Sequence, residues 1–272
     1  MKKKLHGNVS GLRQTLIKSI ESLYTHHIPP AFLYTPELTD ELISLSSAIR
    51  RQIGLLVDRN GRVIYVIVGD AHKIMIPVTD GYMAIPGRLK GLRLLHTHLS
   101  EEALTRDDLT DLALLRLDYI TAICLTTDNQ PGPVYSAHVL PYEESEPYQV
   151  LPPATIDEFD IDCLGQILSL ESELTRLNSL HKPETGKENA FLIDATTTDP
   201  NATWSAMEEL KELCKTSDVN IIGTAVQRRK KIDPKFVVGK GKLSSLYIKA
   251  IQKHATMLVF NTELSPSQLR SI

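Results

Sequence analysis

The stretch FVVGKGKLSSLYIKAIQKHATMLVFNTE, residues 236–263, decides the fold class of this chain. Its first three apolar residues predict a strand, the two glycines after them predict a turn, and the apolar spacing that follows predicts a helix. The apolar run at 257–260 predicts a second strand. Because strands that alternate with helices are joined by right-handed crossovers, the stretch indicates a βαβ unit in a mainly parallel sheet.

The segments before this stretch continue the same alternation. AFLIDA (190–195) predicts a strand, WSAMEELKELCKTS (204–217) predicts a helix, and VNIIGTAVQ (219–227) predicts another strand. Strands and helices in this order are typical of α/β proteins. We therefore expect the C-terminal region, 188–272, to form an α/β unit.

The first half of the chain has a different order of elements. Apolar residues at helical spacing over 37–52 are followed by two β-rich runs that Asn60-Gly61 joins. That dipeptide is a strong signal for a β-hairpin. Two further apolar runs, KIMIPV (73–78) and LRLLHTH (92–98), also predict strands. These elements indicate a second α/β or α+β unit.

We expect three regions along the chain. They are an N-terminal α/β extension at 1–141, a linker and helix at 142–187, and the C-terminal unit at 188–272. The linker is predicted because PYEESEPYQVLPP (141–153) is acidic, rich in proline and without periodicity. The predicted fold class is therefore α/β, with two units of which the C-terminal one has a mainly parallel sheet.

Composition and charge limit the classes of function. The 272 residues are 42% hydrophobic and 23% charged, as in ordinary globular proteins. No apolar run approaches the ~18 residues that span a bilayer, and the N-terminus lacks the apolar core of a secretory signal, so we expect a cytoplasmic protein. Residues 190–272 carry 12 Lys/Arg against 8 Asp/Glu, although the whole chain has a net charge of −3. The C-terminal unit is therefore the expected partner of nucleic acid or phosphate.

Basic residues gather around the glycine turn of the opening stretch. Glycines expose backbone N–H groups, and the N-terminus of a helix attracts anions. The candidate RNA- or phosphate-binding residues are Arg228, Arg229, Lys230, Lys231, Gly239, Lys240, Gly241 and Lys242. A tight turn with solvated lysines is one alternative. An ATP site is another, although no Mg²⁺-binding hydroxyl follows the glycines at P-loop spacing.

A second candidate site lies in the first half. His96 and His98 end an apolar run, and Asp108 falls in the first turn of a helix that Thr105 is placed to cap. Two imidazoles on one strand face and a carboxylate from the next helix would leave a fourth zinc position for water. Structural histidines, a bound metal without catalysis, and a zinc-dependent hydrolase all remain open.

Four motifs of the C-terminal region resemble, in order, the N-terminal domain of HflX-type GTPases, which associate with the large ribosomal subunit. The motifs are FLIDATT (191–197), WSAMEELKELCKTS (204–217), QRRKKIDPKFVVGKGKLSSL (227–246) and LVFNTELSPSQLRSI (258–272). The first half, including VDRNGRVIYVIVGDA (57–71), resembles the extra region of longer members of that family. The resemblance implies that this is the N-terminal portion of such a protein, with the last domain incomplete.

The same resemblance places the nucleotide chemistry elsewhere. No GxxxxGK[ST] sequence occurs in the chain, so the resemblance implies that GTP and Mg²⁺ bind to a GTPase domain downstream of Ile272. The chain alone is then expected to be inactive as a GTPase. The implied partners are the large ribosomal subunit, its 23S rRNA, and guanine nucleotide through that further domain.

The histidine motif resembles the zinc site of JAB/JAMM-type isopeptidases. The matching residues are His96, His98, Thr105 and Asp108. Arg51 stands where that pattern has its catalytic acid, and a cation cannot accept the proton of a metal-bound water. The stretch from His98 to Asp108 is also one residue shorter than the pattern. The resemblance implies an inactive relative, with zinc-dependent hydrolysis as the alternative.

Overall fold

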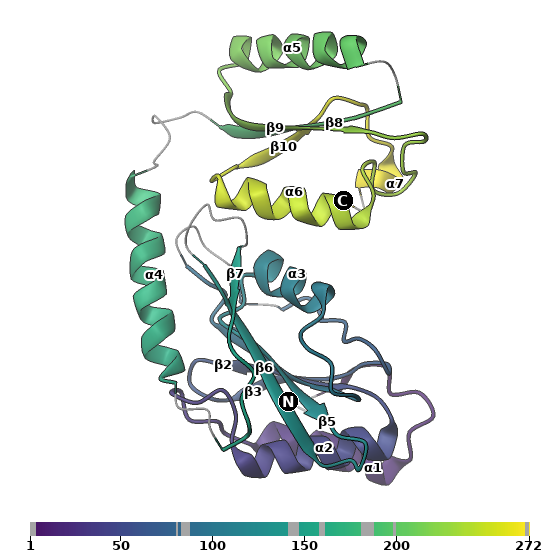
Figure 1. Cartoon of the computed structure of the whole chain (residues 1–272), viewed down its shortest axis with the longest axis vertical. Coiled ribbons are helices and arrows are strands. Elements are labelled where there is room, and N and C mark those ends of the chain that lie inside the picture. Colours follow the sequence, from purple (N-terminus) through teal and green to yellow (C-terminus); the bar gives the residue numbers. More distant parts are fainter. Residues whose placement is uncertain are drawn as a thin grey trace. The chain divides into compact units, whose positions relative to one another are not determined.

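The computed structural model describes residues 4–79, 81–82, 88–140, 147–157, 161–180, 188–197, 200–269 and 272. The chain divides into two compact units (Figure 1). Among the described residues, the first unit contains those up to Leu140 together with Tyr148–Thr175, and the second contains Pro147 and those from Arg176 onward. Each unit combines helices with one β-sheet, which confirms the predicted α/β fold class.

A mixed sheet of seven strands forms the first unit. In chain order the strands are β1 His6–Gly7, β2 Ile53–Asp58, β3 Val63–Val68, β4 Leu92–His98, β5 Ile120–Leu125, β6 Pro131–Val139 and β7 Tyr148–Val150. Their order across the sheet is β1-β3-β2-β4-β5-β6-β7. β2 and β3 are antiparallel neighbours joined at Asn60-Gly61, so the predicted hairpin is confirmed. Gly61 has the positive φ of 85° that such a turn requires.

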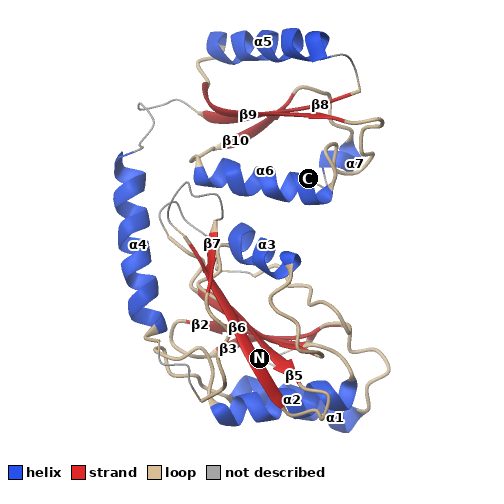
Figure 2. Cartoon of the chain, viewed as in Figure 1, coloured by secondary structure: helices blue, strands red, loops and turns tan. Residues whose placement is uncertain are grey.

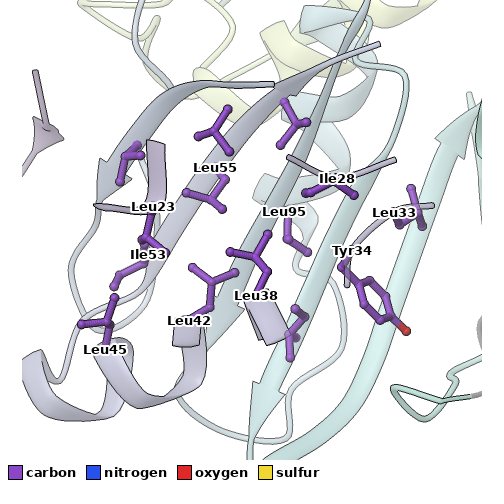
Figure 3. Close-up of a cluster of buried hydrophobic side chains, with 14 of the residues drawn as sticks. Leu23, Ile28, Leu33, Tyr34, Leu38, Leu42, Leu45, Ile53, Leu55 and Leu95 are labelled. Atoms are coloured by element: carbon purple, nitrogen blue, oxygen red, sulfur yellow. The ribbon is translucent and has the colours of Figure 1, made fainter. Parts of the chain in front are cut away.

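Helices cover both faces of this sheet. α1 Gln14–Ser22, the short helix η1 Leu23–Thr25 and α2 Pro36–Ile49 lie on one face, and α3 Arg106–Leu115 lies on the other. Figure 3 shows Leu38 and Leu42 of α2 beside Leu55 and Leu95 of the sheet. Because side chains alternate along a strand, the even-numbered residues of β4 point toward α3. Leu94 accordingly packs with Leu112 of α3.

The helix α4, Cys163–Leu180, is tied to the first unit by an arginine. Arg59 donates through Nε and Nη2 to the two oxygens of Asp118 at 2.6 and 3.0 Å. It donates through Nη1 and Nη2 to Glu171 of α4 at 2.9 and 2.8 Å. We call Arg59, Asp118 and Glu171 the arginine clamp. Bidentate pairs between arginine and carboxylate add geometric specificity to their electrostatic attraction. The arginine clamp therefore fixes the position of α4 on the first unit.

The segment expected to be a linker contains structure of the first unit. Tyr148–Val150 forms β7, which pairs antiparallel with β6 through Ala137 and Val150. Apolar residues of α4 pack against the same core as α2, including Ile167. Residues 141–146, which begin the predicted linker, lie outside the described part of the chain. The division into 1–141, 142–187 and 188–272 remains a proposal.

The strand predicted at 73–78 is not present, and that prediction was wrong. These residues have irregular backbone, although Ile74 and Ile76 pack on the α3 side of the sheet and Met75 is exposed. The side chain of Asp70 accepts hydrogen bonds from the backbone N–H groups of His72 and Lys73. This turn follows directly after β3. Beyond it the burial of side chains alternates at 74–76, but no strand among the described residues forms hydrogen bonds with this segment.

The second unit has a parallel sheet of three strands between two layers of helices. Its strands are β8 Asn189–Thr196, β9 Asn220–Arg228 and β10 Met257–Phe260, in the order β10-β8-β9. Its helices are α5 Pro200–Thr216, α6 Lys240–Gln252 and α7 Pro266–Leu269. α5 and α6 lie on opposite faces of the sheet (Figure 2). The parallel pairing confirms the expected βαβ arrangement.

The strand predicted at 236–238 was also wrong, because this segment forms a tight turn. The side chain of Asp233 accepts hydrogen bonds from the N–H groups of Lys235 and Phe236, and Val237 has a positive φ of 61°. The helix then begins at Lys240, so only Gly239 of the predicted glycine turn lies outside the helix.

None of the helices in the described part of the chain is both long and apolar enough to cross a membrane.

Candidate functional site

A broad, open pocket of about 670 Å³ lies where β9 ends and α6 begins. The carboxyl end of a strand and the N-terminus of a following helix meet here, as is usual for ligand sites of α/β sheets. Its lining residues are Gln227, Arg228, Arg229, Lys230, Lys231, Val238, Gly239, Lys240, Gly241 and Lys242. All eight residues that the sequence marked as phosphate-binding candidates therefore line one pocket, which we call the basic pocket.

Gly239 allows the chain to enter α6 close to an arginine. It is the N-cap residue with φ 83° and ψ 147°, a region that other residues seldom adopt. A Cβ atom built there would lie 2.6 Å from Nη1 of Arg229, whereas one built on Gly241 would meet no atom within 4 Å. The backbone conformation at position 239 thus requires glycine. At position 241 a side chain could be accommodated, because the space beside the first turn of α6 is empty.

The electrostatics of the basic pocket favour an anion. No side chain caps α6, and its first turn holds no acidic residue, so the helix N-terminus retains its partial positive charge. Ion pairs in the described part of the second unit join Lys211 to Glu208 and Lys215 to Glu212, both on α5. The six Lys and Arg side chains of the pocket form none with a described carboxylate. Phosphate groups can therefore reach them without displacing a partner.

The three residues of the predicted metal site also come together. His96 Nε2 lies 3.0 Å from His98 Nε2, and the two nitrogens each lie 3.5 Å from an oxygen of Asp108. Two His and one Asp ligand atoms all fall within 4.8 Å of one another. Both imidazoles are buried, and the carboxylate is partly exposed. We call His96, His98 and Asp108 the histidine cluster.

Each member of the histidine cluster is positioned by its secondary structure. The two histidines are alternate residues of β4 and so share the face that α3 covers. Thr105 caps α3, and its N–H and Oγ1 both donate to Oδ2 of Asp108 at 2.7 Å in a capping box. The predicted role of Thr105 as N-cap is confirmed. Local helix chemistry therefore explains why an aspartate stands there, independently of any metal.

The surroundings of the two histidines shift their pKa values in opposite directions. Complete burial lowers the pKa of His96 to about 4. Burial also acts to lower the pKa of His98, but hydrogen bonds with Asp108 and Cys124 outweigh it and raise that pKa to about 10. The pKa of Asp108 is held below its usual range, because the same histidines and Thr105 outweigh its burial.

Sequence reasoning missed Cys124, which lies beside the cluster. It pairs with His98 in the parallel register of β4 and β5 and is fully buried. Its Sγ donates to the carbonyl of Glu102 at 3.3 Å, and His98 Nδ1 donates to the same oxygen at 2.8 Å. The register of β5 against β4, which places Cys124 beside His98, has no local signal in the sequence.

Arg51 lies apart from the histidine cluster. Its guanidinium donates to the carbonyls of Asn8 at 2.6 Å and Ser10 at 3.0 Å. The residue that replaces the acid of the JAB/JAMM pattern is therefore bound to the N-terminal segment. Among the described residues, Asp108 is the only carboxylate grouped with the two histidines.

The fold and the basic pocket define the class of protein to which the C-terminal region is related. Residues 204–272 match the family described as GTP-binding GTPase N-terminal. This match contains the basic pocket and excludes the histidine cluster. The C-terminal unit thus carries an HflX-type N-terminal region, which confirms the resemblance that its motifs predicted.

Individual relatives agree with this assignment. GTPase HflX of Lacrimispora saccharolytica is 33% identical over 86 residues, which cover 32% of this chain and 20% of the relative. GTPase HflX of Alkalihalophilus pseudofirmus is 36% identical over 67 residues, which cover 25% and 16%. GTPase HflX of Caldanaerobacter subterraneus is 33% identical over 86 residues, which cover 32% and 20%. The chain therefore spans about a fifth of the length of these relatives.

Proposed function

We propose that this chain belongs to a cytoplasmic, HflX-like GTP-binding protein that associates with the large ribosomal subunit. In this proposal the basic pocket contacts phosphates of 23S rRNA, and GTP with Mg²⁺ binds to a further domain of the same protein. The chain itself then serves as a docking and regulatory module. The matches to GTPase HflX proteins support the guanine nucleotide, and the pocket supports the RNA contact.

One observation carries the docking proposal. Six cations surround an open pocket at an uncapped helix N-terminus, and they form no ion pair with a described carboxylate. Lys and Arg side chains that neutralise the phosphates of a nucleic acid release its condensed counterions, and this release favours binding. An open pocket of this volume also suits a backbone that passes across it better than a small molecule that must be enclosed.

The test is binding of the whole chain to purified large ribosomal subunits at increasing salt concentration. If all six cations contact phosphates, affinity falls about a thousandfold between roughly 50 and 200 mM salt. The double variant Lys240→Glu, Lys242→Glu loses most of the binding. Lys249→Glu with Lys253→Glu is the matched control, because it makes the same charge change at two exposed lysines, one in the last turn and one at the C-cap of α6, away from the pocket.

Two results would contradict docking. One is binding that is indifferent to salt and equal in the two double variants. The other is tight binding of ATP alone, lost in Lys240→Glu, Lys242→Glu, without any binding to ribosomal subunits. The second result would favour a nucleotide site at the same pocket.

The alternative proposal is a zinc-dependent hydrolase centred on His96, His98 and Asp108. The observation in its favour is that the three side chains do meet. Hydrolysis also needs a group that accepts a proton from the attacking water. No second carboxylate of the described residues joins the cluster, and Arg51 occupies the position of the expected acid. The geometry therefore supports docking as the first proposal.

A further inference from the structure

We infer that Gln227 accepts a hydrogen bond from the ribose 2′-hydroxyl of an RNA strand whose phosphates lie in the basic pocket. This contact rests on the RNA docking proposed above, because bound phosphates are what bring a ribose to Gln227. Phosphates are the same in RNA and DNA, whereas the 2′-hydroxyl is present only in RNA. Gln227 therefore gives the pocket a selectivity for RNA that its cations cannot supply.

The side-chain oxygen of Gln227 is an acceptor without a donor. Its Oε1 is buried and forms no hydrogen bond with any described residue. Such atoms are few in folded proteins, because a polar group that is buried without a partner costs free energy. Three other side-chain atoms of the described residues share this state, and they belong to Thr79, Arg93 and His96 of the first unit. Within the described part of the second unit, the unpaired oxygen is thus found where the cations gather.

The strand β9 places this amide at the start of α6. Because side chains alternate along a strand, Gln227 lies on the same face of β9 as Ala225. Ala225 packs in the apolar cluster that contains Leu243 and Leu246 of α6. Gln227 is two residues closer to the end of β9, and it lines the basic pocket together with Gly239. The amide therefore faces the helix N-terminus at which we expect a phosphate.

Gln227 supplies a kind of group that the rest of the pocket lacks. The other side chains that line the pocket belong to Arg, Lys, Val and Gly residues, which offer hydrogen-bond donors or apolar surface. The oxygens of a phosphodiester are acceptors only, so they pair with those donors and leave Oε1 of Gln227 unpaired. A ligand that satisfies both must carry a hydrogen-bond donor close to its phosphate.

The 2′-hydroxyl of ribose meets this requirement. It is attached to the carbon next to the one that carries the 3′-phosphate, and every nucleotide of RNA has it. Base amines are also donors, but they lie farther from the phosphate and are absent from uracil. The 2′-hydroxyl is the group by which a protein distinguishes RNA from DNA at a given position.

The amide can turn toward the ligand at little cost. Gln227 is partly exposed, although its Oε1 is covered. The last torsion of a glutamine side chain has broad preferences, so rotation about it can bring the oxygen to the pocket. Because Oε1 has no partner among the described residues, this rotation breaks no hydrogen bond of that oxygen.

Affinities of the whole chain for three single-stranded oligonucleotides of one sequence test the contact. They are RNA, DNA with deoxyuridine in place of thymidine, and RNA in which fluorine replaces every 2′-hydroxyl. The fluorinated strand keeps the sugar pucker of RNA but has no 2′ donor. We expect about three- to tenfold tighter binding of RNA than of the other two, as one net hydrogen bond contributes. Fluorescence anisotropy at constant low salt measures all three.

The variant Gln227→Met removes the acceptor and keeps the length of the side chain. It should lower the affinity for RNA to the level that the wild type shows for DNA, without a change in the affinity for DNA. Gln252→Met is the matched control, because Gln252 is the last residue of α6 and lies outside the pocket. It should keep the full preference for RNA. Circular dichroism checks that both variants fold, and the three strands still test the contact in the wild type if one does not.

Three results would overturn the contact. The first is equal affinity of the wild type for the three strands, and the second is a preference for RNA that persists in Gln227→Met. The third is an equal loss of RNA and DNA affinity in Gln227→Met, which would assign the donor to a base, because both strands carry the same base amines.

The double variant Lys240→Glu, Lys242→Glu separates these results from a failure of docking. It should abolish binding of every strand, even where the wild type shows no preference for RNA. Strong binding that survives in this double variant would refute docking at the basic pocket, and the contact of Gln227 with it.

Discussion

The two units of this chain use charge in opposite ways. In the first unit, Arg59 is enclosed by Asp118 and Glu171, whose side chains are 6% and 12% exposed. In the second, the six cations of the basic pocket have no described carboxylate partner. Charges taken out of water are costly unless they are paired, whereas exposed charges are not. In the first unit the arginine clamp therefore uses paired charges to stabilise the fold. In the second unit the charges of the basic pocket stay accessible to a ligand.

Removal of the arginine is expected to have the largest effect. Arg59→Ala leaves the buried Asp118 and the partly buried Glu171 without the guanidinium that hydrogen-bonds both, and loss of one partner of a buried pair costs up to about 3–5 kcal/mol. Urea unfolding followed by circular dichroism measures this loss. Arg62→Ala, in the same hairpin but exposed, should change stability by less than about 0.5 kcal/mol. Equal effects of the two changes would refute a structural role for the clamp.

A substitution at the N-terminus of α6 tests the second unit in the same way. Gly239→Ala places a Cβ at φ 83° and against Arg229, so we expect a stability loss of about 1–3 kcal/mol and weaker RNA binding. Gly241→Ala is the control, because it meets open space inside a helix and should stabilise by up to about 1 kcal/mol. Calorimetry of the two variants gives both values. Similar losses in both would mean that the backbone of Gly239 is not special.

The smallest expected effect is a dependence on pH. Burial raises the pKa of Glu171, but hydrogen bonds from Arg59 and the N–H of Leu89 outweigh it and lower that pKa below 4.5. The carboxylate therefore contributes stability that is fully present above pH 4.5 and is lost as the pH falls through the lowered pKa.

Glu171→Gln provides the measurement. The variant should be less stable than wild type near neutral pH, and the difference in the free energy of unfolding should shrink as the solution is made acidic. A difference that stays constant from neutral to acidic pH would show that Glu171 does not act through its charge.

Local signals in the sequence were sufficient for several elements. The Asn60-Gly61 turn, the cap at Thr105 and the alternation of 190–260 each depend on residues close together in the chain, and the structure confirms them. The eight basic-pocket candidates were found because they lie within two short stretches at 228–231 and 239–242.

The features that were not predicted from the sequence depend on contacts between residues that are far apart in the chain. The prediction of a strand at 73–78 was wrong, because alternating apolar residues form a strand only where another strand lies beside them to share hydrogen bonds. The proline-rich segment predicted to be a linker contains β7, because pairing with β6 outweighs the proline content around that strand. The placement of Cys124 beside His98 depends on register between two strands, and only the folded sheet defines it.

The arginine clamp has a practical consequence for dissecting the molecule. A recombinant fragment that stops at the apparent proline-rich boundary near residue 141 would omit both β7 and Glu171. Such a fragment would keep Arg59 but lose one of its two anionic partners, and it would also lose Ile167 of α4, which packs in the same core as α2. The first compact unit therefore extends to Thr175, and biochemical work on the separate units should place the cut beyond that residue.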